Sequence, residues 1–445
     1  MGVGLYASHS NICCIGSDYP QGILFYIKEI EIINDSQEDP LLLVWQTGKD
    51  VLRDARSCEL LKREEKRIRE RKRKMKKICL LNHGLASGGT DSFVLTLAKG
   101  LLADGYDVTI AMAVDPDSPP QFREAEAIAM GAKIYKTSDL DGIKKILRHC
   151  KRLYQFLKAE KFDVFHANMD LFNGFNMPVA WLAGVPVRVC HSHNSQSQYE
   201  ANTGKHFVVN VYRTIMRAFL WSFSNRRCGC SEMAMDYLFQ QKWKKDVNSS
   251  VIYNGIDFSR FTYDGFDKAN KKKELGLPEN RLLITVGRFA EQKNPMFTIR
   301  VMEELHKLRP ELHLIWIGDG DLRSQIETKI AETGSNYIHL LGTQKNVNDY
   351  LRCADLFLMP SLFEGLGIAA IEAQAADLPC VLSDAIPQQV NLGLCQFISL
   401  KESTATWAEA ICDILDGKFC LMMDEEKRKQ FDQNYMVKSV EEFYE

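Results

Sequence analysis

Short apolar runs alternate with amphipathic stretches along most of this chain, from about residue 76 onward. Apolar runs of about four to eight residues that end in glycine or polar residues are typical of strands buried on both faces of a sheet. The stretches between the runs carry apolar residues at helical spacing, which predicts a helix after most strands. This alternation favours an α/β fold with doubly wound, parallel sheets. The predicted strands lie at 76–84, 107–114, 132–136, 163–167, 185–193, 228–231, 251–255, 281–287, 312–318, 337–342, 355–360 and 378–383.

The series of predicted strands starts twice, near residue 77 and again near residue 281. A polar, turn-rich segment at 257–280 separates the two series, and a chain of 445 residues is longer than one core usually supports. We therefore expect two Rossmann-like domains that face each other across a cleft. The expected parts are an N-terminal domain at 75–255, a C-terminal domain at 256–430 and a helix at 431–445 that crosses back onto the first domain.

Residues 1–74 do not follow the alternation. An apolar run at 23–33 precedes a charged stretch at 62–77, which holds eleven lysines and arginines against three glutamates. Most such charge runs form solvated helix faces, so contact with a membrane surface is the weaker interpretation. Met75 heads a run that would make an ordinary start for a Rossmann-type domain. Two interpretations of 1–74 stay open, an appendage of unclear status or an upstream stretch added by a mistaken start.

Composition limits the classes of function. The net charge is −2, so no polyanion-binding surface extends over the chain and we expect no nucleic acid partner. Thirteen cysteines are scattered without a CxxC pair, which favours reduced thiols over a zinc site or a disulfide framework. No apolar run reaches the roughly 18–20 residues of a membrane span, and the pattern of a secretion signal is missing from the N-terminus. We therefore expect a cytoplasmic protein, with peripheral contact at the inner face of the membrane left open.

Residues 360–379 read PSLFEGLGIAAIEAQAADLP, in which Glu364 and Glu372 stand among small and apolar residues. The segment follows a predicted buried strand, and ligands of open α/β sheets bind at the carboxyl ends of strands. Gly365 and Gly367 would let the backbone approach a ligand, and the helix start beside them offers free N–H groups that suit a phosphate. A carboxylate in such surroundings is costly unless it is hydrogen-bonded, and sugar hydroxyls are natural donors. The alternative is one surface glutamate and one that pairs with an arginine.

A second candidate site lies at 281–295, which reads RLLITVGRFAEQKNP. A predicted strand ends at Gly287, Arg288 follows it, and Lys293 stands just before a helix. Two cations at one strand end suit a diphosphate, because arginine binds phosphate oxygens through a fork of N–H groups and lysine acts as a point charge. Two solvated surface cations are the alternative interpretation, which loses weight if the loop at 361–367 lies beside them.

These segments together resemble the C-terminal, nucleotide-sugar-binding half of the GT-B glycosyltransferases, and specifically the large retaining family four, or glycosyl transferases group 1. That family carries the motifs NG(V/I)D…F, GR…K(G/N), G(D/E)GxL and two glutamates eight positions apart. The corresponding residues here are Asn254-Gly255-Ile256-Asp257…Phe261, Gly287-Arg288…Lys293-Asn294, Gly318-Asp319-Gly320-Asp321-Leu322 and Glu364…Glu372. The match runs in order from about residue 76 onward and is specific as a set, but it does not cover 1–74.

The N-terminal half agrees with this resemblance. The segment Gly88–Asp91, GGTD, stands where the family has a glycine-rich loop over the cleft, with aspartate near where glutamate is more usual. The run DVFHAN matches the family's D(V/I)(V/I)HxH, with Asn168 in place of the second histidine. The family's cleft histidine falls within RVCHSHN, where His193 is favoured and His191 is the alternative. Either could instead be a structural histidine that caps a strand.

The resemblance implies a nucleoside diphosphate sugar as donor, with a UDP-sugar favoured, and retention of configuration at the reacting carbon. Arg288 and Lys293 would bind the diphosphate and stabilise the negative charge that grows as the glycosidic bond breaks. Glu372 would accept hydrogen bonds from the ribose, while Glu364 and His193 would contact the transferred sugar. The other donor-binding residues implied are Gly88, Gly89, Asn254, Gly287, Gly365, Leu366 and Gly367. Because the sequence offers no Asp-x-Asp in a suitable loop, we expect no metal and no other cofactor.

The sequence gives less evidence about the acceptor site. We expect Ser87–Thr90 and the residues after His193 to line it. The stretch 206–227 mixes aromatic residues with four arginines. It suits either an amphipathic helix on a membrane surface, beside a lipid-linked acceptor, or a buried core helix with cationic ends. Because family members of this subtype often build capsular polysaccharide or exopolysaccharide, the working hypothesis is a glycan or lipid-linked acceptor in bacterial surface-polysaccharide synthesis. The alternatives are a sugar-nucleotide-binding protein without turnover and a sugar-nucleotide epimerase of the same fold.

Overall fold

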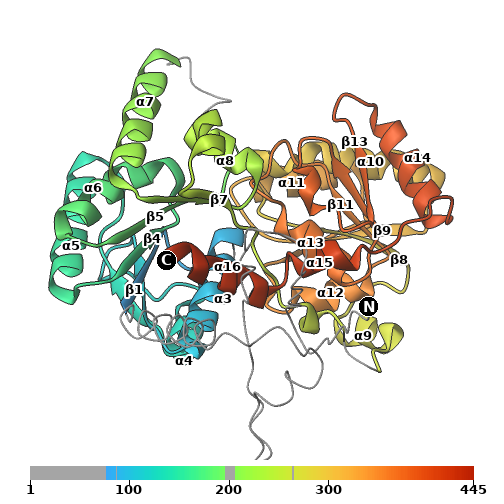
Figure 1. Cartoon of the computed structure of the whole chain (residues 1–445). Coiled ribbons are helices and arrows are strands. Elements are labelled where there is room, and N and C mark those ends of the chain that lie inside the picture. The colour runs from blue at the N-terminus through green and yellow to red at the C-terminus, as the bar shows by residue number, and fades with distance from the viewer. Residues whose placement is uncertain (1–76, 87, 196–205, 263–264) are drawn as a thin grey trace, which may run out of the picture. The chain divides into compact units, whose positions relative to one another are not determined.

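The computed structural model describes residues 77–86, 88–195, 206–262 and 265–445. The predictions made for residues 1–74 and for Ser87 lie outside the described residues. Within the described residues the chain forms two parallel sheets, one of seven strands and one of six, with helices on both faces of each (Figure 1). The predicted α/β class with doubly wound parallel sheets is therefore confirmed.

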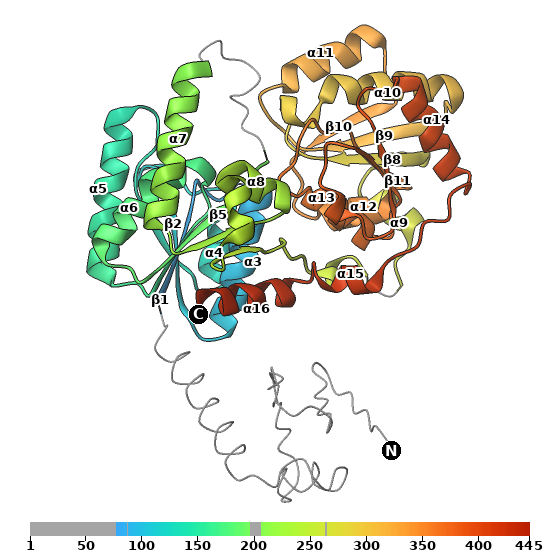
Figure 2. The same cartoon turned by 45° about the horizontal axis from the view of Figure 1, so that its top comes forward.

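The first sheet has the strand order β3-β2-β1-β4-β5-β6-β7. Its strands are β1 (Lys77–Asn82), β2 (Asp107–Met112), β3 (Lys133–Lys136), β4 (Val164–Ala167), β5 (Val187–Ser192), β6 (Arg226–Gly229) and β7 (Ser249–Val251). Its helices are α3 (Gly89–Ala103), α4 (Glu124–Ala129), α5 (Ile143–Glu160), α6 (Asn173–Ala183), α7 (His206–Phe223) and α8 (Glu232–Phe239). Apolar residues of α3 and α4 cover one face, and those of α5 to α8 cover the other (Figure 2). The central strand β1 is therefore apolar and buried from Ile78 to Leu81.

The second sheet has the strand order β10-β9-β8-β11-β12-β13. Its strands are β8 (Arg281–Val286), β9 (Leu312–Ile317), β10 (Ile338–Gly342), β11 (Leu356–Met359), β12 (Cys380–Ser383) and β13 (Cys395–Ile398). Its helices are α9 (Lys268–Glu274), α10 (Pro295–Leu308), α11 (Arg323–Thr333), α12 (Val347–Cys353), α13 (Ile368–Ala375), α14 (Thr404–Leu415) and α15 (Glu425–Lys429). Helix α9 lies within the segment predicted to be polar and turn-rich. Strand β13 was not predicted, because a four-residue edge strand that contains a glutamine has little apolar signal.

Both sheets reverse the direction of their connections near the middle, between β1 and β4 in the first and between β8 and β11 in the second. At such a switch point the loops after the two strands diverge to opposite faces. The divergence leaves a crevice at the carboxyl ends, where ligands of doubly wound sheets bind. The loops after β1 and β4, and those after β8 and β11, are thus the places where a site is expected.

The last described helix, α16 (Gln433–Tyr444), leaves the second sheet and packs on α3 of the first. Its start is tied to the segment between the sheets, where the N–H of Ile256 donates to Phe431 at 2.8 Å and Gln433 donates to Ile256 at 3.0 Å. A Cβ atom on Gly100 of α3 would lie 2.4 Å from Cγ2 of Val437, so a glycine is needed where the two helices touch. The predicted helix that crosses back onto the first sheet is confirmed.

Candidate active site

Glycines bring the loops at the carboxyl ends of β8 and β9 into direct contact. A Cβ on Gly318 would lie 2.0 Å from the carbonyl oxygen of Gly287, and one on Gly320 would lie 2.6 Å from that of Phe289. Neither position has room for a side chain, so the sequence GDG after β9 is required for this packing. A Cβ on Gly287 would lie 2.9 Å from Cε of Lys293, so the lysine stem crosses the end of β8.

Lys293 and Glu364 form a largely buried ion pair that joins the loop after β8 to the loop after β11. Lys293 Nζ donates to Glu364 Oε1 at 2.6 Å, and the two side chains are 20% and 8% exposed. Gln292 Nε2 donates to the other oxygen of Glu364 at 3.3 Å, and the Gln292 carbonyl accepts the N–H of Leu362 at 2.8 Å. A buried charge is costly without a partner, so each of the two charges depends on the other. Two predicted site residues from separate motifs therefore meet.

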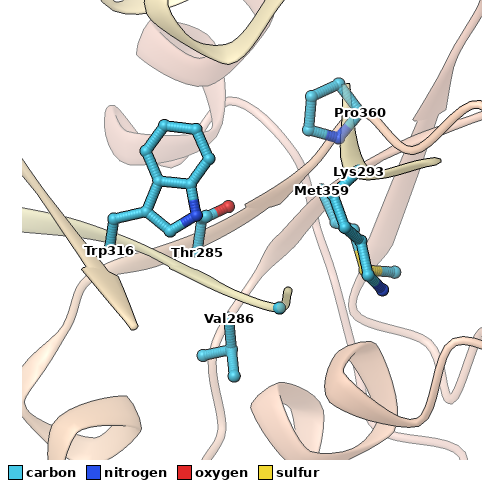
Figure 3. A pocket seen from close by; sticks show the side chains of 7 residues that line it. Thr285, Val286, Lys293, Trp316, Met359 and Pro360 are labelled. Atoms are coloured by element: carbon cyan, nitrogen blue, oxygen red, sulfur yellow. The ribbon is translucent and has the colours of Figure 1, made fainter. Parts of the chain in front are cut away.

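A small pocket opens beside this ion pair at the carboxyl ends of β8, β9 and β11 (Figure 3). Its lining residues are Thr285, Val286, Gly287, Lys293, Trp316, Met359 and Pro360. The lining combines apolar side chains with Thr285 and Lys293, and the cavity of about 10 Å³ has room for little more than one water molecule. The pocket lies at the switch point of the second sheet, where the topology predicts a ligand.

The loop after β11 and the start of α13 contact the loops of the first sheet. A Cβ on Gly365 would lie 1.7 Å from the carbonyl oxygen of His193, so only glycine allows this approach. The hydroxyl of Ser231, which caps α8, donates to the carbonyl oxygen of Gly365. A Cβ on Gly89, the first residue of α3, would lie 3.5 Å from Cγ2 of Ile368, the first residue of α13. Two helix starts, one from each sheet, thus lie close together, and their free N–H groups favour an anion.

Gly367 caps α13 in the left-handed conformation, with φ of 94°, which favours glycine. The sequence analysis placed the start of this helix near Leu366, two positions before Ile368, where it begins. The Leu366 side chain is buried in the core of the second sheet. It can therefore offer a ligand only its backbone.

Arg288 and Asn254 differ in how they are placed. Arg288 is exposed and forms no ion pair within the described part of the chain, and its stem lies against Gly320. Asn254 is buried, and its Oδ1 lacks a hydrogen-bond partner among the described residues. A Cβ on the neighbouring Gly255 would lie 2.7 Å from Cα of Gln433, so this pair lies where α16 begins. The guanidinium of Arg288 is therefore accessible to a ligand, whereas the amide oxygen of Asn254 is buried.

Glu372 is partly buried on α13, and no described residue donates a hydrogen bond to its side-chain carboxyl. Burial raises the pKa of its carboxyl to about 7, and the positive charges of Arg260 and Arg123 oppose that rise. The carboxylate form is therefore costly until a donor binds it. The two predicted glutamates thus differ, because Glu364 has a lysine partner and Glu372 has no hydrogen-bond donor in the described chain.

His193 follows β5 and is held through both its backbone and its ring. Its N–H donates to Asp170 Oδ1 at 2.7 Å, and its Nε2 lies 2.9 Å from Asn168 Oδ1. The amide nitrogen of Asn168 donates to the carbonyl of Leu81 at 3.2 Å, which turns its amide oxygen toward the ring. His193 Nε2 therefore carries the proton, and Nδ1 is an acceptor without a partner among the described residues. Burial lowers the pKa of His193 to about 3, so the ring is neutral at physiological pH.

His191, the alternative candidate from the sequence, lies two residues before His193, so the two side chains lie on the same face of the sheet. Its Nδ1 is 3.0 Å from Nε2 of His166, and its ring stacks on that of His193 with centroids 4.0 Å apart. His191 is fully buried, whereas the backbone of His193 reaches the loop after β11 through Gly365. Of the two histidines, His193 has the position that the candidate site requires.

Asp170 is a residue that the sequence analysis missed. Its carboxylate accepts the N–H groups of His193 and Asn194, and the Asn194 side-chain amide at 2.6 Å. Its backbone is left-handed, with φ of 46°, a strained conformation of the kind that clusters at functional sites. Burial raises the pKa of Asp170, and these hydrogen bonds oppose the rise. Its position in the loop after the predicted strand DVFHA could have identified this aspartate as a candidate site residue.

Asp91 shapes the glycine-rich loop before α3. Its Oδ2 accepts the N–H of Gly88 at 2.9 Å, and its Oδ1 accepts the amide nitrogen of Asn82 at 2.8 Å. The first contact is the half of a capping box that the third residue of a helix supplies. The carboxylate thus holds the loop after β1 in place from the first turn of α3.

Comparisons with known proteins identify the family of this chain. Residues 87–260 match the family model described as Glycosyltransferase Family 4, and residues 280–417 match the model described as Glycosyl transferases group 1. The chain is 31% identical over 341 residues to EpsF of Bacillus subtilis (strain 168), which covers 76% of this chain and 87% of EpsF. It is 30% identical over 239 residues to the UDP-Gal:alpha-D-GlcNAc-diphosphoundecaprenol alpha-1,3-galactosyltransferase of Escherichia coli, which covers 52% of this chain and 60% of that enzyme.

A solved structure supports the fold. HepE of Anabaena, in complex with UDP-glucose, matches with a TM-score of 0.68 at 17% identity and covers 82% of this chain and 98% of HepE. This likeness confirms the predicted GT-B architecture. The match to EpsF extends over most of that protein, and the two family models fall on the two sheets in turn. The chain is therefore a GT-B glycosyltransferase and belongs to glycosyltransferase family four, the glycosyl transferases group 1.

Proposed function

We propose that this enzyme is a retaining glycosyltransferase that moves a sugar from a UDP-sugar to a lipid-linked or glycan acceptor in bacterial surface-polysaccharide synthesis. The observation that carries the proposal is the loop after β11, which pairs with Lys293 through Glu364 and contacts His193 through Gly365. One loop thus joins a cation, a carboxylate, a helix start and a histidine. Two relatives support the substrates, since HepE binds UDP-glucose and the E. coli enzyme is named for a UDP-galactose donor and a diphosphoundecaprenol-linked acceptor.

The leaving diphosphate would be stabilised by Lys293, Arg288 and the first N–H groups of α13. Negative charge grows on the diphosphate as the glycosidic bond breaks, and preorganised donors and cations stabilise that charge. Lys293 is held at the strand end by Glu364, while Arg288 has no ion-pair partner in the described chain. These groups supply the positive charge that a bound metal supplies in other transferases, so we expect turnover without a metal.

His193 and Glu364 would contact the transferred sugar. The Nδ1 of His193 lacks a donor among the described residues, and a sugar hydroxyl provides one. A histidine whose pKa is about 3 is a weak base at neutral pH, so we assign it hydrogen bonding rather than proton abstraction. Among the described residues, Glu364 Oε2 receives one contact, from the Gln292 amide at 3.3 Å, and it can also accept a hydrogen bond from a sugar hydroxyl.

Glu372 would accept hydrogen bonds from the ribose hydroxyls. Its carboxyl has a pKa of about 7 in the free enzyme, and only the carboxylate accepts both hydroxyls. UDP affinity is therefore expected to rise as pH increases from about 6 to 8. Calorimetric titration with UDP measures the rise, which Glu372→Gln should remove while weakening binding at pH 8. The control is Glu304→Gln, at an exposed pair on α10, and equal affinity of Glu372→Gln and wild type at pH 8 would contradict the ribose role.

Helix α7 provides a surface for a lipid-linked acceptor. Its exposed apolar residues, at helical spacing, are Val208, Val211, Tyr212, Ile215 and Phe219. Met216 and Leu220, on the side that faces the protein, are buried. The helix thus has one side in the core and one exposed apolar side, so it has features of both the core helix and the amphipathic surface helix considered from the sequence. No helix in the described part of the chain has the length and apolar character to cross a membrane. An exposed apolar stripe of this kind suits the interface of a bilayer, which we propose is the inner face of the membrane.

The double variant Val211→Asp/Ile215→Asp tests this surface. It is expected to lose most of its cosedimentation with vesicles of phosphatidylethanolamine and phosphatidylglycerol, because two charges oppose insertion into the interface. UDP binding should be unchanged. The control is Ile128→Asp, an exposed apolar residue on α4. Vesicle binding equal to wild type in the double variant would remove α7 from the membrane contact.

The proposed reaction is tested with the full-length chain, a panel of UDP-sugars and N-acetylglucosamine-diphosphoundecaprenol as acceptor. We expect UDP release from one sugar of the panel, dependent on the acceptor and unaffected by EDTA, and NMR of the product should show retained configuration. A new sugar nucleotide formed without acceptor would instead indicate the epimerase. UDP-sugar binding without release under every condition would indicate a binding protein.

A further inference from the structure

Four buried side chains form a continuous column between α16 and the candidate active site. The hydroxyl of Tyr444 lies 2.8 Å from Nδ1 of His166, and Nε2 of His166 lies 3.0 Å from Nδ1 of His191. The ring of His191 stacks on that of His193, with centroids 4.0 Å apart and planes inclined by 25°. The column therefore connects a helix that arrives from the second sheet to the histidine that contacts the loop after β11.

The protons of this column can be placed by counting donors and acceptors. Burial lowers the pKa of His166 to about 3, lowers that of His191 well below its ordinary value and raises that of Tyr444, so all three are neutral. If Tyr444 donates to His166, then His166 donates to His191, and only the Nε2–H of His191 lacks a partner in the described chain. The reverse direction would leave both the tyrosine O–H and the His191 lone pair unfilled. Because unfilled buried groups are costly, the column donates from Tyr444 toward His191.

Phe93 of α3 packs beside the column. Its ring contacts the three histidine rings with centroid distances between 4.7 and 6.0 Å. The His193 ring is thus confined by His191 on one face, by Phe93 at the side and by Asn168 at Nε2. Its Nδ1 is buried and lacks a hydrogen-bond partner among the described residues.

The thiol of Cys228 lies within 4.8 Å of ring nitrogens of His166 and His191, a grouping that could hold a metal ion. Burial raises the pKa of this thiol well above its ordinary value, and the neighbouring thiols of Cys190 and Cys230 raise it further. Metal ligation needs a thiolate and unoccupied imidazole nitrogens. Here Nε2 of His166 and Nδ1 of His191 bond to each other, and Nδ1 of His166 bonds to Tyr444, so the cluster fits a hydrogen-bonded column.

We propose that Tyr444, His166 and His191 are positioning residues that hold the ring of His193, so that docking of α16 on the first sheet controls the donor-sugar contact. The inference rests on the donor contact proposed above for His193. Helix α16 lies along α3 (Figure 2), and its residues Val437 and Tyr444 are buried in the core of the first sheet. Its start is bonded to Ile256, which packs in the core of the second sheet. Because α16 contacts the cores of both sheets, a change in how it docks on the first sheet would alter the position of the His193 ring.

The test compares Tyr444→Phe, which removes one hydroxyl, with Tyr435→Phe, a tyrosine on the same helix that is 54% exposed. Full-length protein labelled with 15N-histidine reports the tautomer and surroundings of each ring by NMR, and single His→Gln variants assign the signals. We expect Tyr444→Phe to shift the His166, His191 and His193 signals. We also expect it to lower kcat about fivefold to tenfold with little change in donor KM, as for the loss of one buried hydrogen bond. Tyr435→Phe should leave both measurements unchanged.

Unchanged His193 signals in Tyr444→Phe would overturn the proposal, because the ring would then be held without the column. Shifted His193 signals with an unchanged kcat would support the column and count against the donor contact assigned to His193. The pair His191→Phe and His191→Ala tests the stacking step, because phenylalanine keeps a flat ring against His193. Greater turnover in His191→Phe than in His191→Ala supports the column, and an equal loss in both contradicts it.

Discussion

Replacing Lys293 by alanine is expected to lower kcat by at least about a hundredfold, on the scale of losing one contact to transition-state charge. Lys293 lies across the carboxyl end of β8, where the leaving diphosphate is proposed to bind. Its removal also leaves Glu364, with a side chain 8% exposed, as a buried carboxylate without its cation. The variant should therefore lose both turnover and thermal stability, which steady-state kinetics and thermal unfolding measure.

The double variant Lys293→Ala/Glu364→Gln separates these two effects. A neutral amide does not need the cation, so the double variant should recover thermal stability without recovering turnover. The matched control is Lys307→Ala, which removes a lysine from the exposed pair with Glu304 and should change neither quantity. Near-normal turnover in Lys293→Ala would exclude the lysine from the site.

Gly365→Ala is expected to lower turnover by about a hundredfold, because a displacement of about 1 Å at a catalytic site is enough for a loss of that size. The new Cβ would lie 1.7 Å from the carbonyl oxygen of His193, so the loop after β11 and the loop after β5 must move apart. That movement would separate Glu364 from His193 and break the hydrogen bond that Ser231 donates to Gly365. Single-turnover kinetics at saturating donor would show the loss in the chemical step.

The control for Gly365→Ala is Gly417→Ala. Gly417 has φ of 73°, and a Cβ there would have nothing within 4 Å. The control therefore strains the backbone without moving a neighbour, so it should lower stability slightly and leave turnover per folded molecule unchanged. If Gly365→Ala kept wild-type turnover, the close approach of the two loops would not be needed for catalysis.

The architecture could be predicted from the sequence, and so could the placement of the candidate site residues at strand ends, because each motif follows a predicted strand. Gly287 and Lys293 follow one apolar run and Glu364 follows another. In a parallel sheet these ends lie on the same edge, so spacing along the chain was enough to expect them near each other. The ion pair between Lys293 and Glu364 was not foreseen, because each residue had been assigned a separate part of the donor.

The residues that hold His193 could not be predicted in the same way. Asp170 and Asn168 hold it from the loop after β4, and Ser231 holds the neighbouring Gly365 of the other sheet through a hydroxyl hydrogen bond. Their roles depend on contacts between loops that follow different strands. A single sequence has no local pattern that predicts such contacts. The hydrogen bond between Tyr444 and His166 joins residues 278 positions apart, which no local pattern can indicate.

The packing of α16 also constrains how the molecule is made. Met436, Val437, Val440 and Tyr444 complete a hydrophobic core whose first strand begins at Lys77. When the strands of the first sheet have left the ribosome, α16, which completes their core, has not yet been synthesised. The early half of the chain must therefore remain incompletely folded, with apolar surface uncovered, until the last helix emerges, and contacts this distant in sequence form slowly. We expect this interval to be the stage of biosynthesis at which chaperones bind the nascent chain.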